Sequence, residues 1–132
     1  MSLSPLFEEA DLIHVYTRAQ AIEDGCLIDV TEVAKEARFK VPVALTAAVW
    51  ADCVSWDNNA EKRHQDERGR LWDVLWMAAL AGTKSPNDST VPFAILRIPH
   101  RGSKARQVRL VMTIGPGDDG EPVVTIMQPG ED

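Results

Sequence analysis

The chain has 132 residues, of which 45% are hydrophobic and 26% are charged, and its formal net charge is -6. These values are typical of a globular protein and argue against extended disorder, and a chain of this length can bury a core without metal or disulfide cross-links. The negative net charge disfavours unspecific binding to nucleic acid or to an anionic membrane, because such binding needs clustered positive charge.

The start of the chain predicts short elements. Residues 1–10 show no clear period and are expected to form a loose arm, whereas residues 11–16 alternate in a way that indicates an extended segment or an additional strand. Thr17 and Gln20 have the spacing of a capping box at the start of a short helix. Arg18 lies in the first turn of this helix, where the dipole disfavours a cation, so we expect an acidic partner or a ligand for it and favour a structural ion pair.

The two cysteines, Cys26 and Cys53, fall on separate predicted elements, and no secretory signal precedes them. We therefore expect both to be reduced and buried. No apolar run approaches the roughly 20 residues that span a bilayer, which predicts a cytoplasmic protein without membrane contact.

Three helices are predicted between residues 31 and 80. A short one covers residues 31–38, and two longer ones cover residues 44–56 and 65–80, which together carry all four tryptophans. The last helix is apolar over most of its circumference at about 100° per residue, so several elements should cover it. The polar segment between the long helices predicts a Trp-rich helical hairpin. A tryptophan left exposed on it would mark a surface for a protein partner or a homodimer.

The C-terminal part predicts strands. Turn-forming residues cluster at 82–90, and three runs rich in β-branched residues follow at 91–98, 106–114 and 122–128. They predict an antiparallel meander with a turn at GPGDDG. The fold class is therefore α+β in a single domain, residues 1–132, with a mainly helical part at 11–82 packed on a three- or four-stranded antiparallel sheet at 91–128.

Positive charge is concentrated at the first hairpin of this meander, where no acidic residue occurs between Arg97 and Arg109. One interpretation is a solvated end of the sheet, balanced by the acidic residues that follow. The other is a phosphate or nucleic-acid site, with arginines as bidentate phosphate donors. The candidate ligands of phosphate are Arg97, His100, Arg101, Lys104 and Arg106.

A polar stripe on the last helix is the second candidate site. Asp66, Arg70 and Asp73 have the spacing of ordinary ion pairs on a helix surface, although with His64 and Asp52 they could also serve acid–base chemistry. No HExxH or CxxC spacing occurs, so we expect neither a metal nor a cofactor.

Four segments resemble a family of small, functionally uncharacterised proteins of bacteria, phages and plasmids, and the similarity spans nearly the whole chain. The segments are TRAQAIEDGCLIDVTE (17–32), PVALTAAVWADC (42–53), QDERGRLWDVLWMA (65–78) and GPGDDGEPVVTIMQPGED (115–132). The resemblance implies a bacterial, mobile-element setting, and it transfers no activity and no catalytic residue.

We expect a non-enzymatic binding or accessory protein of bacterial mobile elements, with nucleic acid as a less favoured partner. The alternative is a small nuclease or phosphate-binding protein that acts through the basic hairpin, residues 97–109. In outline the predicted fold is similar to small bacterial endoribonuclease toxins, in which His100 with Arg101 or Arg106 would handle the scissile phosphate and Thr125 would assist. This chain has no convincing general-base glutamate near the hairpin, which counts against that similarity.

Overall fold

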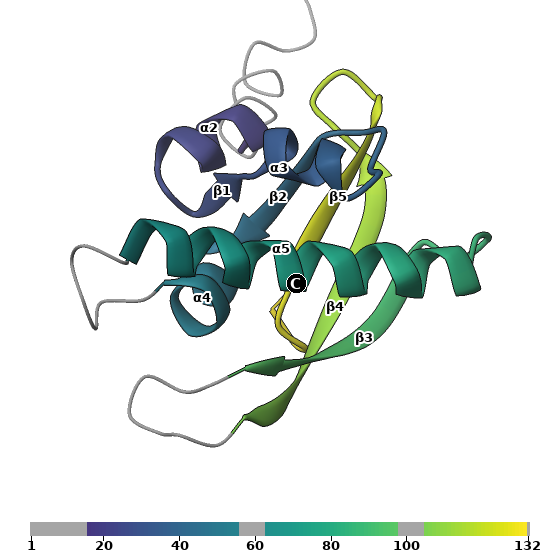
Figure 1. Cartoon of the computed structure of the whole chain (residues 1–132). Helices are drawn as coiled ribbons and strands as arrows, with labels where there is room; N and C mark the ends of the chain where they lie inside the picture. Colours follow the sequence, from purple (N-terminus) through teal and green to yellow (C-terminus); the bar gives the residue numbers. More distant parts are fainter. Residues whose placement is uncertain (1–15, 56–62, 98–104, 132) are drawn as a thin grey trace, which may run out of the picture.

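The computed structural model describes residues 16–55, 63–97 and 105–131, and its centre is a five-stranded sheet (Figure 1). The strand order is β1-β2-β5-β4-β3. The strands are β1 Leu27–Asp29, β2 Val43–Thr46, β3 Thr90–Arg97, β4 Arg106–Pro116 and β5 Pro122–Met127. The helices are α2 Arg18–Glu23, α3 Thr31–Glu36, α4 Ala47–Val49, a π-helix at Trp50–Val54 and α5 Arg63–Lys84.

The sheet is mixed. The predicted meander is present, because β3 pairs with β4 and β4 with β5 in antiparallel fashion. On its other side β5 pairs with β2 in parallel, and β2 pairs with β1 in antiparallel fashion. The prediction of a purely antiparallel sheet of three or four strands is therefore wrong. The two additional strands lie in the part of the chain that was expected to be mainly helical, whereas residues 11–15, the expected extra strand, lie outside the described residues.

The predicted helix at residues 44–56 is wrong at its start, where residues 44–46 belong to β2. Val43, Ala44 and Leu45 form β2 and are fully buried, since the strand lies inside the sheet between two neighbours. A strand covered on both faces has no polar alternation, which made this stretch resemble a helix. Thr46 then ends the strand and caps the next turn, where its Oγ1 accepts the backbone N–H of Val49 at 3.2 Å. Only a short α4 and the π-helix follow, so the Trp-rich helical hairpin does not form.

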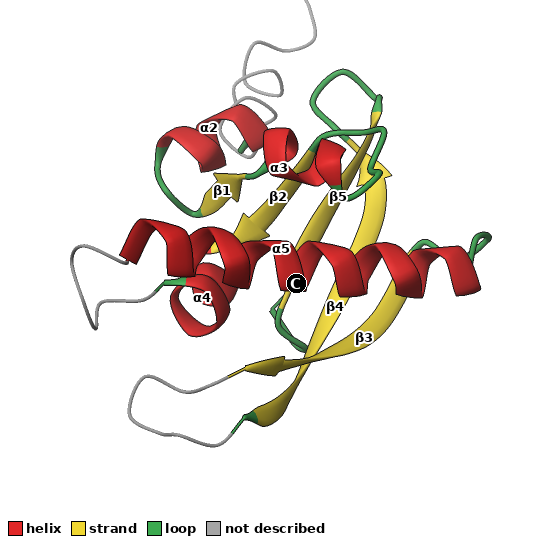
Figure 2. Ribbon diagram, viewed as in Figure 1, coloured by secondary structure: helices red, strands yellow, loops and turns green. Residues whose placement is uncertain are grey.

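The predicted long helix is confirmed and extends beyond the expected bounds as α5. It crosses one face of the sheet (Figure 2). Leu71, Val74, Leu75 and Ala78 point into the core, where each is at most 5% exposed. None of the helices in the described ranges combines the length and the apolar character that a membrane span requires.

Candidate functional site

An open apolar groove of about 570 Å³ runs beside α5. One wall is the second half of α5, and the other is the segment 37–41 that follows α3. Residues of β4 and β5, among them Met112, Ile114 and Val124, form the floor. The groove thus joins three parts of the chain that are distant in sequence.

The wall formed by α5 is an apolar helix face. Trp76, Ala79, Leu80 and Thr83 line the groove at i, i+3, i+4 and i+7, which places them in one row along the helix. Trp76 and Leu80 are each 39% exposed. The ring of Trp76 stacks on Trp72, with centroids 5.7 Å apart and planes 18° apart. This contact favours one orientation of the exposed indole.

The floor depends on a close approach between α5 and β4. Gly82 lines the groove, and a Cβ atom at this position would lie 3.3 Å from Cε of the buried Met112. Because glycine has no side chain, α5 can approach β4 closely at Gly82. Ile114, near the end of β4, is 39% exposed and extends the apolar surface outward.

The second wall begins at the C-terminus of α3, which ends in a Schellman motif. The backbone N–H of Phe39 donates to the carbonyl oxygen of Ala34, and that of Arg38 donates to the carbonyl oxygen of Lys35, both at 3.0 Å. Arg38 has a φ of 79° and occupies the left-handed position that glycine usually takes. Arg38 and Lys40 are exposed at this wall and are the charged side chains that line the groove.

The chemistry of the lining suits binding. No carboxylate, imidazole or thiol is among the residues that line the groove. The Thr83 hydroxyl is engaged, because it donates to the carbonyl oxygen of Leu80 at 2.7 Å. The lining therefore offers apolar contact and two cations.

A second hollow, of about 430 Å³, lies where α5 meets β3. It is lined by Trp76, Met77, Leu96 and other residues, and its charged member is Asp73. The two hollows therefore have opposite charge at their rims. An anionic group is attracted to the groove and repelled by the second hollow.

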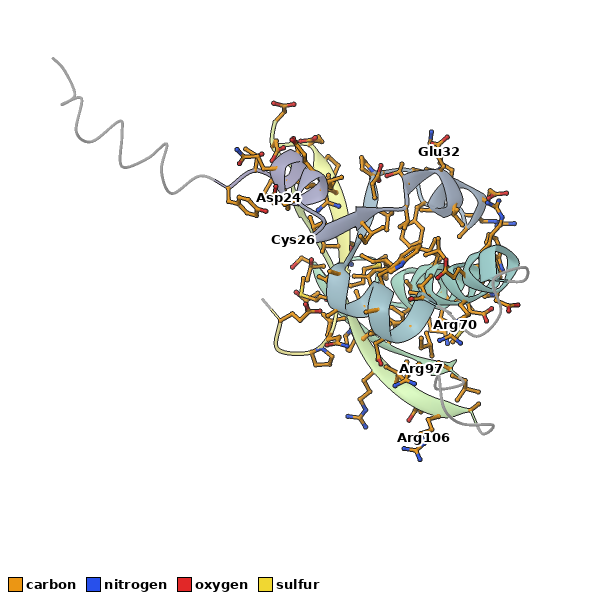
Figure 3. The ribbon with its side chains drawn as sticks, turned by 90° about the vertical axis from the view of Figure 1, so that its left-hand side faces the viewer. Asp24, Cys26, Glu32, Arg70, Arg97 and Arg106 are labelled. Carbon is orange, nitrogen blue, oxygen red and sulfur yellow. The ribbon has the colours of Figure 1, made fainter. Side chains whose placement is uncertain are left out.

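The structure brings together residues from both predicted sites. Nη2 of Arg97, from the basic hairpin, lies 3.0 Å from Oδ1 of Asp52 on the π-helix. Arg70, from the polar stripe, lies on the same side of the molecule as Arg97 (Figure 3). Its Nε donates to the carbonyl oxygen of Val54 at 3.2 Å. Burial lowers the pKa of Arg70, and the nearby Arg97 guanidinium acts in the same direction. These contacts hold the end of the π-helix against α5 and β3.

The other predicted site residues are dispersed. Arg106 is the register partner of Arg97 and is exposed, whereas Arg109 lies on the opposite face because strand side chains alternate. Asp66 is partly buried and Asp73 is exposed. His100, Arg101 and Lys104 lie outside the described residues, as does the side chain of His64. Within the described ranges, His, Cys, Asp and Glu side chains form no group of three or more that could hold a metal ion.

The cysteines differ from each other. Cys53 is buried, as predicted, and burial together with the Asp52 carboxylate raises the pKa of its thiol to about 11. Cys26 is exposed, so the prediction that both are buried is wrong for this residue. The hydroxyl of Tyr16 donates to Oδ2 of Asp24 at 2.7 Å, and the sulfur of Cys26 lies 3.6 Å from the same hydroxyl oxygen. Hydrogen bonds to Asp24 and Cys26 raise the pKa of Tyr16.

Sequence reasoning missed the groove. It placed Trp76 in a helical hairpin and gave Arg38 no role. The chain carried no local signal for the groove, because the predicted helix at residues 31–38 includes Arg38 and the walls come from segments that are distant in sequence.

Comparison with known proteins gives a family and no function. A family model described as "Family of unknown function (DUF6573)" matches residues 3–132. Searches of the curated proteins and of the solved structures gave no match. The match extends over nearly the whole sequence, so the chain belongs to this family of unknown function.

Proposed function

We propose that the protein is a non-enzymatic binding protein that holds the apolar part of a small amphiphilic molecule in the groove beside α5. The observation that carries the proposal is the groove itself, at about 570 Å³ and rimmed by Trp76, Leu80 and Ile114, each 39% exposed. Sites for small molecules are concave, mostly apolar and of this size. We place the protein in the setting of bacterial mobile elements, as an accessory factor.

Binding without catalysis is supported by the lining. Its apolar side chains gain from the removal of water, while the polar atom of Thr83 already has a partner within α5. Two cations at one wall orient a ligand. They do not supply the acid and base that bond cleavage usually requires.

A phosphate-bearing ligand at the basic hairpin is the second candidate. Arg97 and Arg106 are register partners on the same face of β3 and β4, so their side chains are neighbours. Asp52 already neutralises Arg97 at 3.0 Å, and we therefore favour the groove. Titration of fluorescein-labelled RNA and single-stranded DNA at low salt, with wild type and Arg106→Gln, separates the two candidates. Tight, salt-sensitive binding that is lost in this variant would favour the hairpin.

The groove is tested with Nile red, a neutral apolar dye whose fluorescence rises in apolar surroundings. We expect saturable binding to the wild type and loss of binding in Ala79→Phe, whose larger side chain fills the groove. Ala94→Leu is the matched control, because Ala94 lines the second hollow. Circular dichroism and the Tm confirm that both variants fold. An unsaturable signal, or equal binding by wild type and a folded Ala79→Phe, would contradict the proposal.

A further inference from the structure

We infer that the ligand of the groove is an anionic amphiphile, whose acidic head group binds at Arg38 and Lys40 while its apolar body lies along α5. The inference rests on the proposed function and adds the charge of the ligand and the residues that select it. Three features of the groove support it: the distribution of charge, the backbone of Arg38 and the contrast with the second hollow.

The charge around the groove is one-sided. Neighbouring cations on the same side of the molecule are paired, since Lys35 lies 3.0 Å from Glu32 and Arg68 lies 2.8 Å from Glu36. Within the described part of the chain, no carboxylate lies within ion-pair distance of Arg38 or Lys40. The two cations are thus available to an anion that enters from solvent.

The strained backbone conformation of Arg38 indicates that its side chain has a function. A residue with a Cβ atom loses stability at a φ of 79°, where glycine does not. The Schellman motif itself needs only the backbone N–H groups of Arg38 and Phe39. Strained positions of this kind concentrate at ligand sites, and Arg38 is one of the residues that line the groove.

The second hollow explains why the anion should select the groove. Both hollows share Trp76 and both are apolar, so apolar contact alone does not distinguish them. Asp73 at the second hollow repels an acidic head group, whereas Arg38 and Lys40 attract it. Charge therefore decides where such a ligand binds.

The test compares decanoate with decanol, which share an alkyl chain and differ in the charge of the head. Dissociation constants are measured from tryptophan fluorescence for the wild type, the double variant Arg38→Gly/Lys40→Gln and the control Lys35→Gln. Lys35→Gln also removes positive charge from the 35–40 segment, but at a paired residue that does not line the groove. Each probe is compared between the wild type and the variants, so the different solubilities of decanoate and decanol in water do not affect the result.

The expected result is that the double variant binds decanoate roughly three- to tenfold more weakly and binds decanol unchanged. Lys35→Gln should change neither constant, and the effect of the double variant should shrink at high salt. The inference fails if the double variant changes the dissociation constants of decanoate and decanol by the same factor while decanol still saturates the wild type. The proposed function then survives. If neither probe binds the wild type, both fail. A dimeric mass by light scattering that Ala79→Phe reduces to a monomer would show instead that a second copy occupies the groove.

Discussion

Asp118 caps the helix that begins at Arg18, although 100 residues separate the two in sequence. Oδ1 of Asp118 accepts the backbone N–H of Arg18 at 2.7 Å, and Oδ2 accepts that of Ala19 at 3.0 Å. The turn between β4 and β5 thereby supplies the acidic group that the start of α2 requires. The Arg18 guanidinium donates to Oγ1 of Thr125 and to the carbonyl oxygen of Val124, both at 2.7 Å, so the helix is fixed to β5 as well.

Asp118→Ala should lower the free energy of unfolding by about 1 kcal/mol, because two backbone N–H groups at a helix start lose their acceptor. Urea denaturation measures the change. Asp119→Ala is the matched control in the same turn, because Asp119 contacts Glu121 through its backbone N–H, which the substitution keeps, and it should stay within about 0.5 kcal/mol of the wild type. Equal effects of the two variants would show that the turn tolerates the loss and that the cap contributes little.

Arg38→Gly should raise the free energy of unfolding by about 0.5–1 kcal/mol, since glycine adopts the observed φ of 79° without strain. Arg38→Ala keeps the strained backbone and should give no such gain. Thermal and urea denaturation of both variants measure the difference. Lower stability of both variants than of the wild type would mean that the arginine side chain stabilises the fold, and it would weaken the case for a ligand at this wall.

The two thiols should react at different rates. Cys26 is exposed and Cys53 is buried, so an aromatic disulfide reagent should modify one thiol of the native protein quickly and the second only after denaturant is added. Cys26→Ser should remove the fast phase and leave the slow one. Two fast equivalents in the native wild type would contradict the burial of Cys53.

Stability should fall at alkaline pH because of Cys53. Its thiol has an ordinary pKa of 9.0 and a folded pKa of about 11, so between these values the unfolded state binds fewer protons than the folded state. The contribution of the protonated Cys53 thiol to the free energy of unfolding is complete below pH 9. It declines as the pH rises toward 11, at up to about 1.4 kcal/mol per pH unit. Urea denaturation across this range should give a steeper decline for the wild type than for Cys53→Ala. Parallel declines would show that the folded thiol ionises normally.

The sequence predicted the elements whose signals are local. α5 followed from a long apolar helical period, and β3, β4 and β5 followed from β-branched runs separated by turn residues. The capping box at Thr17 and Gln20 is present as predicted, with the Oγ1 of Thr17 accepting the N–H of Gln20 at 3.0 Å. In each case residues that are close in sequence are sufficient to predict the element.

What the sequence left undetermined depends on contacts between distant segments. Val43, Ala44 and Leu45 become a strand because β5 pairs with them in parallel, which no local pattern indicates. The groove unites α5 with the segment 37–41 and with β4, so it exists only once the sheet order is set. The meeting of Arg97 with Asp52 has the same origin, because the strand edge and the π-helix become neighbours through the fold.

The most direct test of ligand binding at the groove is a map of backbone amide chemical shifts by NMR as decanoate is added. The groove predicts saturable shifts at Arg38, Phe39 and Lys40 and along α5 from Trp76 to Thr83, with small changes at Ala94 and Gln107 of the second hollow. Shifts concentrated at Ala94, Leu96 and Gln107, or at Arg97 and Arg106 of the basic hairpin, would contradict it, as would a spectrum that does not change.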